Sequence, residues 1–302
     1  MRIRRGAWTV SLVAAILALS AISADADSMY TVETQISFDP LTITSTLMSI
    51  DTTTLIMTPI GPLGVPFLFG DLAWDSATDT LYMINGLFVP GLPYTAATPP
   101  NALYTVNTTT GAATLVGPHG LDRLFALGFD SAADAMYASQ FIPDAPLERM
   151  DLATGAATAI GTGVGTDISI GAMAFDSLTN QLFGLSDGEC ATACADMYTI
   201  DPVTGLATLV PSIDLDTDNS GMTFDPVLNR LWDLDAEGRL SFFFYNSAAA
   251  AFTQTEVTTY PSPPEVFFIY DGLAWVAPEP ATWVLLLAGF AALGVRARRG
   301  RR

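Results

Sequence analysis

The sequence predicts an all-β protein: a propeller of about five four-stranded blades closed by both termini, with an N-terminal signal peptide and a short C-terminal transmembrane helix. Three observations predict this class. Two different hairpin phrases alternate along the chain, each phrase recurs about every 50 residues, and no helical pattern interrupts the series. A single unit of this length cannot bury both faces of its sheet, so successive copies must stack. Four-stranded units at this period are typical of propeller blades.

The first 26 residues have the parts of a secretory signal peptide. Three arginines lie within the first five residues, Val10–Ile22 is an apolar run, and Ala24-Asp25-Ala26 is a small-x-small cleavage site. We therefore expect residues 1–26 to be removed and the repeat domain to occupy residues 27–277. An uncleaved N-terminal anchor is the alternative.

The first phrase is a small residue, an aromatic residue and an aspartate, followed by a short turn and an apolar-aromatic pair. Its copies are Leu72-Ala73-Trp74-Asp75, Leu127-Gly128-Phe129-Asp130, Met173-Ala174-Phe175-Asp176, Met222-Thr223-Phe224-Asp225 and the partial Gly272-Leu273-Ala274-Trp275. Their aromatic residues are spaced 55, 46, 49 and 51 positions apart. Apolar and polar residues alternate on both sides of the turn, which predicts a hairpin whose turn the aspartate caps.

The second phrase reads Leu-Tyr-x-apolar-Asp-x-x-Thr-Gly-x-Ala-Thr. Its clear copies are Leu103–Gly117, Leu147–Gly161 and Met197–Pro211, and its weaker copies are Met48–Gly61, with Leu55 in place of the glycine, and Leu240–Thr253, with Asn246 in place of the aspartate. The glycines supply the positive φ of a type I turn with a bulge, so this phrase also predicts a hairpin.

Five copies of each phrase alternate, and the chain enters on a second phrase and leaves on a first phrase. This order suits a ring in which one blade takes strands from both ends, with Met29–Val32 beside Leu273–Val276. A six-bladed ring, a sandwich and an open solenoid are the alternatives. The phrases also resemble propeller-like repeats of exported bacterial proteins, which implies a fold but no particular activity.

Acidic residues are concentrated in the middle of the chain, whereas most of the basic residues lie at its two ends. All twelve basic residues are arginines, and residues 27–280 carry four of them against thirty acids, a net charge of −26. A domain this acidic has no basic footprint for nucleic acid. His119 is the only histidine, so mechanisms that need two are excluded, and we expect it to be a surface loop residue.

The last 25 residues, 278–302, have three parts. Pro278-Glu279-Pro280 precedes the apolar run Ala281–Val295, and Arg296, Arg298 and Arg299 begin a basic end. As a helix, 281–295 spans about 22 Å, less than a hydrocarbon core of about 30 Å. Arginines favour the cytoplasmic side, which places the acidic domain outside.

This C-terminus resembles the PEP-CTERM sorting signal of Gram-negative bacteria, on the Pro-Glu-Pro triplet, the short apolar helix and the terminal arginines. The resemblance implies processing by an exosortase, a membrane-embedded cysteine protease. It also implies a precursor held in the inner membrane by its C-terminal helix, and a mature domain at the cell surface or in the medium. Proteins of this family occur in species that make exopolysaccharide, so exopolysaccharide is an expected partner. A plain C-terminal anchor is the alternative.

Two local features of the repeat domain suggest binding or bracing sites. Asp214, Asp216 and Asp218 place acidic oxygens at alternate positions, a pattern that suits calcium, although a solvated acidic loop explains it too. No cofactor other than this calcium is expected. Cys190 and Cys194 form an even pair in an oxidising compartment, which predicts a local disulfide.

No catalytic residue stands out in the sequence. The repeated aspartates Asp75, Asp130, Asp176 and Asp225 fit turn capping better than acid/base pairs. Aromatic runs at 242–245 and 267–270 fit core packing better than exposed sugar platforms, while the insertion 85–101 is a candidate for recognition. We therefore expect a non-catalytic binding or structural module of the cell surface or the biofilm matrix. The alternative is a propeller hydrolase or lyase that acts on extracellular glycans through paired carboxylates.

Overall fold

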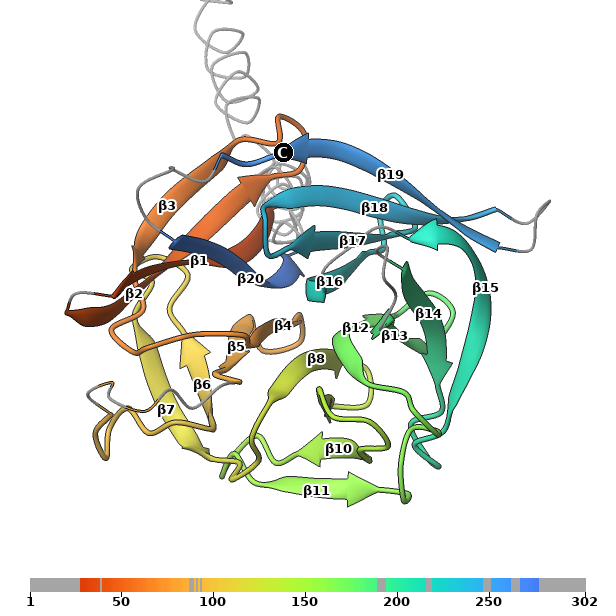
Figure 1. Cartoon of the computed structure of the whole chain (residues 1–302), viewed down its shortest axis with the longest axis horizontal. Helices are drawn as coiled ribbons and strands as arrows, with labels where there is room; N and C mark the ends of the chain where they lie inside the picture. Colours follow the sequence, from red (N-terminus) through yellow and green to blue (C-terminus); the bar gives the residue numbers. More distant parts are fainter. Residues whose placement is uncertain are drawn as a thin grey trace, which may run out of the picture. The chain divides into compact units, whose positions relative to one another are not determined.

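The protein folds as a five-bladed β-propeller (Figure 1). The computed structural model describes residues 28–38, 40–86, 90, 92, 94–188, 194–215, 219–246, 251–261 and 267–276. Ser28–Val276 form one compact unit, in which the described strands make five groups of four around a ring. The predicted all-β class and the predicted blade number are both confirmed.

Each blade runs from an innermost to an outermost strand, and neighbouring strands are antiparallel. Blade 1 contains β4 (Asp71–Asp75), β5 (Thr80–Ile84), β6 (Ala102–Val106) and β7 (Ala113–Pro118). Blade 2 contains β8 (Leu124–Asp130), β9 (Ala135–Gln140), β10 (Leu147–Met150) and β11 (Ala157–Ile160). Blade 3 contains β12 (Ile170–Asp176), β13 (Gln181–Gly188), β14 (Cys194–Ile200) and β15 (Ala207–Leu215). Blade 4 contains β16 (Asn219–Asp225), β17 (Arg230–Asp235), β18 (Arg239–Asn246) and β19 (Ala251–Thr259).

Blade 5 combines strands from both ends of the described domain. It contains β20 (Phe267–Val276) innermost, followed by β1 (Ser28–Phe38), β2 (Leu41–Asp51) and β3 (Met57–Pro62). Met29 lies opposite Trp275 and Tyr30 opposite Ala274 in the antiparallel register of β1 and β20. The register shifts between Tyr30 and Val32, where β20 contains Gly272 with a φ of 68°.

The hydrophobic core lies in the seams between blades. Phe67, Leu72 and Tyr104 are among the buried residues that join blade 5 to blade 1, and separate clusters fill the seams between blades 1 and 2, 2 and 3, and 3 and 4. The repeated aromatics Phe129 and Phe175 belong to these clusters. Successive side chains of a strand point to opposite faces of its blade. Both faces are packed, because each one lies against a neighbouring blade.

The hairpin turn of each clear second phrase contacts the backbone of the preceding blade. Asn107 accepts hydrogen bonds from the N–H groups of Thr109 and Thr110, both at 2.9 Å, and Gly111 follows with a φ of 80°. A Cβ atom on Gly111 would lie 2.2 Å from the carbonyl oxygen of Gly61 in blade 5, so only glycine fits. The same caps recur at Asp51, Asp151 and Asp201. Gly155 and Gly205 approach the previous blade in the same way, which confirms the predicted turns.

The seam between blades 3 and 4 is built differently. The last hairpin has Asn246 where the repeat has its capping residue and lacks the glycine that follows. Here β15 and β19 pair directly and in parallel, with Ser212 opposite Phe252 and Ile213 opposite Thr253. The outer strands of these two blades therefore meet over a short stretch instead of being held by a glycine turn.

The predicted signal peptide 1–26 and the sorting segment 278–302, with its helix 281–295, lie outside the described residues. Within the part of the chain that the structure describes, no helix is long and apolar enough to cross a membrane.

Candidate functional site

The repeated aspartates cap turns, as the sequence analysis favoured. The Oδ1 atom of Asp176 accepts the N–H groups of Leu178 at 2.8 Å and Thr179 at 3.2 Å. The Oδ1 atom of Asp225 accepts from Val227 and Leu228, both at 2.9 Å. Equivalent bonds occur at Asp75 and Asp130. Each of these carboxylates is therefore committed to its own hairpin.

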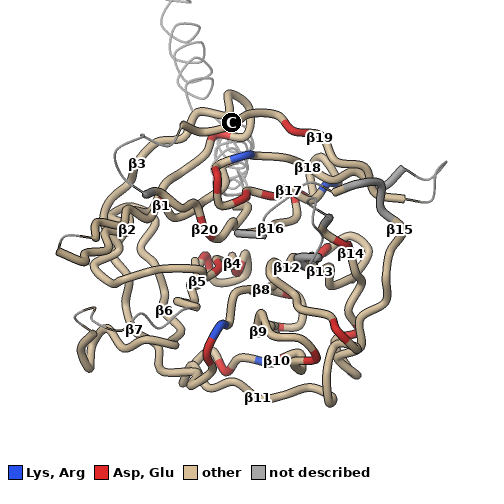
Figure 2. The backbone as a smooth tube through the Cα atoms, viewed as in Figure 1, with Lys and Arg blue, Asp and Glu red and all other residues tan. Residues whose placement is uncertain are grey.

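A different aspartate holds three blades together at the ring centre, where Figure 2 shows acidic positions in red beside β4. Asp71 is fully buried at the start of β4. Its Oδ1 atom accepts the N–H groups of Leu72 at 2.8 Å and of Leu273 in β20 at 3.3 Å. Its Oδ2 atom accepts the N–H of Leu127 in β8 at 2.8 Å. One side chain thus joins the innermost strands of blades 5, 1 and 2.

A second buried acid, Asp271, lies close enough to Asp71 for their charges to interact. The Oδ2 atom of Asp271 accepts the N–H of Phe69 at 3.0 Å, and the residue is 1% exposed. Burial raises the pKa of Asp271 to about 7, against the effect of that hydrogen bond. Burial also raises the pKa of Asp71 well above its ordinary value, and repulsion from Asp271 adds to the rise. The two carboxyls form a coupled pair that retains protons at higher pH than exposed acids.

Sequence reasoning missed this central pair. Asp71 immediately precedes the first phrase, and the corresponding residues of blades 2, 3 and 4 are Ala126, Ala172 and Gly221. A carboxylate at a position that is otherwise small was the available signal. The repeat pattern marks the aspartates that recur, whereas Asp71 occurs at its position in one blade only.

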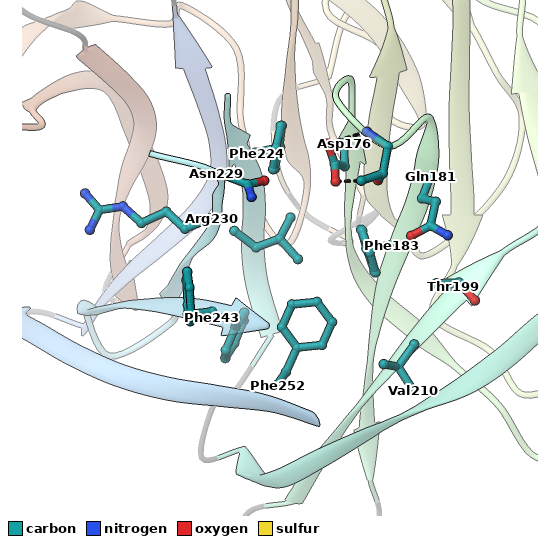
Figure 3. Close-up of a pocket in the computed structure, with 13 residues that line it drawn as sticks. Asp176, Gln181, Phe183, Thr199, Val210, Phe224, Asn229, Arg230, Phe243 and Phe252 are labelled. Carbon is teal, nitrogen blue, oxygen red and sulfur yellow. Dashed lines mark hydrogen bonds between the residues drawn. The ribbon is translucent and has the colours of Figure 1, made fainter. Parts of the chain in front are cut away.

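A pocket of about 470 Å³ opens between blades 3 and 4 (Figure 3). It lies in the seam where β15 and β19 pair only over a short stretch. The lining residues from blade 3 are Asp176, Thr179, Gln181, Phe183, Thr199 and Val210, and those from blade 4 are Phe224, Asn229, Arg230, Leu231, Phe243, Phe244 and Phe252. Its size lies within the range of small-molecule sites, about 300–1,000 Å³.

Five of the thirteen lining residues of the pocket are phenylalanines. Phe183 and Phe252 meet edge to face, with ring centres 5.5 Å apart, and Phe243 is fully buried beneath the opening. Phe244, the next residue, is 50% exposed. The aromatic run 242–245 was predicted to pack in the core, and that prediction is correct for Phe243 but wrong for Phe244.

The polar groups at the pocket edge are neutral or already engaged. Arg230 lies 3.6 Å from Asp225, and its guanidinium carbon sits 3.9 Å from the ring centre of Trp232 and 4.6 Å from that of Phe242. Figure 3 shows this guanidinium directed away from the pocket rings. Gln181 and Asn229 are exposed amides beside the opening.

His119 is buried rather than on the surface, which corrects the sequence prediction. It is 8% exposed, and its Nδ1 atom accepts the N–H of Leu121 at 3.3 Å. Burial lowers its pKa to about 4, so the imidazole is neutral at pH 7.

The insertion 85–101 is held against blade 1 by two hydrogen bonds. The Asn85 Nδ2 and Tyr104 hydroxyl groups both donate to the Pro99 carbonyl, at 3.2 and 2.7 Å.

Several predicted sites lie outside the described residues. Asp216, Asp218 and Cys190 are not described, nor are the side chains of Asp214 and Cys194. The calcium loop and the disulfide stay predictions. Among the residues that the structure does describe, no group of three or more His, Cys, Asp or Glu side chains is placed to hold a metal ion.

Comparison with known proteins identifies the C-terminal end. Residues 276–302 match the PEP-CTERM protein-sorting motif. This motif implies export through an exosortase-type system and a C-terminal membrane anchor in the precursor. A search of curated proteins found no match to the sequence.

The solved structures that the search found are distant from this chain. The chain is 10% identical to one in a nidogen/laminin complex, covering 82% of this chain and 98% of that one with a TM-score of 0.48. It is 14% identical to a protein of unknown function from Bacteroides thetaiotaomicron, over 78% of this chain and 62% of that one, with a TM-score of 0.47. For TolB from Acinetobacter baumannii the identity is 12%, the coverage 83% and 67%, and the TM-score 0.45. These values are too low to support an argument about function.

Proposed function

We propose that this chain is an exported module of the cell surface or the extracellular matrix, in which the propeller binds exopolysaccharide without catalysing a reaction. The main support for this proposal is the sorting motif at residues 276–302, because such a motif directs a protein to an exosortase-type processing system. The precursor is held in the inner membrane by 281–295 with its arginines in the cytoplasm. Processing at Pro278-Glu279-Pro280 then releases the propeller to the surface or the medium.

The state of the buried acids supports binding rather than catalysis. Asp71 is fully buried and Asp271 is 1% exposed, and each accepts backbone N–H groups. Glycoside chemistry needs two carboxyl groups that reach the scissile bond from a common pocket. The central pair instead supports the ring, while the pocket between blades 3 and 4 offers a separate place for a ligand.

The test is binding of the detergent-solubilised full-length chain to immobilised exopolysaccharide from the producing organism. We expect saturable binding in millimolar calcium.

We also propose that calcium binds to Asp214, Asp216 and Asp218. Chelation of calcium should therefore weaken exopolysaccharide binding or lower the melting temperature of the native chain. A variant with asparagine at these three positions should lose that dependence. Absence of binding both with calcium and with chelator would refute the proposal.

A hydrolase or lyase is the second candidate, favoured by the proximity and raised pKa values of Asp71 and Asp271. It predicts new reducing ends or unsaturated sugars when the chain is incubated with the polymer. Asp271→Asn should abolish that product while circular dichroism shows an intact fold. If the native chain binds the polymer and leaves its size unchanged, the enzyme candidate is rejected.

A further inference from the structure

The pocket between blades 3 and 4 exists because the repeat is broken there. At three other seams a glycine turn touches the previous blade; for example, a Cβ on Gly155 would lie 2.3 Å from the Gly117 carbonyl oxygen. At the seam between blades 4 and 5, Leu55 takes the glycine position with a φ of 58°, and its carbonyl accepts the Tyr260 hydroxyl at 3.0 Å. The hairpin of β18 and β19 has no such glycine, and β19 pairs with β15 over Ser212–Ile213 instead. At the seam between blades 3 and 4, the departure is accompanied by a pocket lined in part by phenylalanines.

We infer that this pocket is the glycan site of the protein and that it takes an uncharged pyranose unit; this inference rests on the proposed function. A sugar ring has apolar C–H faces and a rim of hydroxyl groups. The pocket matches both parts, because Phe244 offers a ring that is 50% exposed, beside a wall that includes Phe183 and Phe252, each 6% exposed. Gln181 and Asn229 offer amide donors and acceptors at the opening.

The charges of the site select against acidic sugars. Arg230 is the one base among the described lining residues, and it is engaged by Asp225, Trp232 and Phe242. Asp176, the acid at the edge, already accepts three hydrogen bonds from its own turn. No free cation among these residues faces the pocket, and residues 27–280 carry a net charge of −26, so a uronate would be repelled.

Two variants test the aromatic and the polar part of the pocket separately, and neither changes a buried residue. Phe244→Ala removes an exposed ring, and Gln181→Ala removes an exposed amide. Loss of one aromatic contact or of one hydrogen bond should each weaken binding about 3- to 10-fold. Phe38→Ala is the matched control, because Phe38 is a 73% exposed phenylalanine at the end of β1 and does not line the pocket.

The experiment measures binding of the full-length chain in detergent to a panel of neutral tetrasaccharides of glucose, galactose and mannose, and to tetragalacturonate, by saturation-transfer NMR and calorimetry. We expect at least one neutral probe to bind at least 10-fold more tightly than tetragalacturonate. Both pocket variants should weaken that binding and Phe38→Ala should not.

The outcomes separate this inference from the proposed function. If the chain binds its own exopolysaccharide but both pocket variants bind as the native chain does, the site is wrong and the function stands. Equal or tighter binding of tetragalacturonate, or no binding of any neutral probe, overturns the ligand class. If the chain does not bind the native polymer at all, the proposed function itself fails.

Discussion

The buried acid pair predicts an unusual dependence of stability on pH. In the folded protein the pKa of Asp271 is raised to about 7 by burial, whereas an aspartate in an unfolded chain titrates near 3.9. Between these values the folded state binds more protons than the unfolded state. The free energy of unfolding therefore falls as pH rises from about 4 to about 7. Asp71 contributes with the same sign, since burial raises its pKa too.

The magnitude follows from the width of the window. Each pKa unit of difference is worth about 1.4 kcal/mol, so a rise of about three units at Asp271 removes about 4 kcal/mol of stability between pH 4 and pH 7. This is a large part of the 5–15 kcal/mol that stabilises a typical domain. Asp271→Asn keeps the size of the side chain and its acceptor oxygen, but it cannot ionise.

Urea unfolding at pH 4.5, 5.5, 6.5 and 7.5, followed by tryptophan fluorescence, measures this slope. The native chain should become steadily less stable, and Asp271→Asn should flatten the dependence and exceed the native stability at pH 7.5. Repulsion among the thirty acids of residues 27–280 gives a slope of the same sign. The series is therefore repeated in 0.5 M NaCl, which screens exposed charges but not a buried pair.

Asp122→Asn is the matched control, because it removes one acid from an exposed loop. Its high-salt slope should equal that of the native chain. Stability that rises between pH 4.5 and 7.5 in high salt, or an unchanged slope in Asp271→Asn, would show that the ring centre does not retain a proton and would refute the reasoning.

Four further predictions concern other parts of the chain. Leu55 has a φ of 58° where the repeat has glycine, so Leu55→Gly should raise the free energy of unfolding by up to about 1 kcal/mol in thermal melts. Gly155→Ala should lower it by about 1–3 kcal/mol, and equal melting temperatures would contradict both. Cys190 and Cys194 should resist alkylation in the exported protein until a reductant is added; prior labelling would exclude the disulfide. Alanines at Pro278-Glu279-Pro280 should leave an unprocessed, membrane-bound precursor on immunoblots, whereas normal release would contradict the sorting role.

The number of blades was predictable because two different hairpin phrases each occur five times. Each blade needs one copy of each phrase, and residues such as Gly111 and Asp176 have backbone roles that their spacing already reveals. Such positions are set by local geometry, so a one-dimensional pattern is enough to find them.

The central pair and the pocket depend on contacts that a repeat does not encode. Asp71 acquires its role from the N–H groups of Leu127 and Leu273, which come from strands of two other blades. The pocket arises where two departures from the repeat, the missing glycine after Asn246 and the outward Phe244, occur together in blade 4, which faces blade 3. His119 resembled a surface loop residue by its Gly and Pro neighbours, yet the loop itself is packed against blade 1 through Asn101.

The composition of blade 5 has a consequence for assembly outside the cell. β1 is made first and β20 last, so the edge of β1 that β20 covers stays open, with unpaired N–H and C=O groups, until the last residues of the domain have crossed the membrane. Joining positions as distant as Met29 and Trp275 is also a slow step in folding. An edge open in this way offers a neighbouring copy's β20 strand the same hydrogen-bonding groups. Crowded export would therefore yield strand-exchanged chains of propellers, and the timing of secretion would decide between separate rings and a linked polymer.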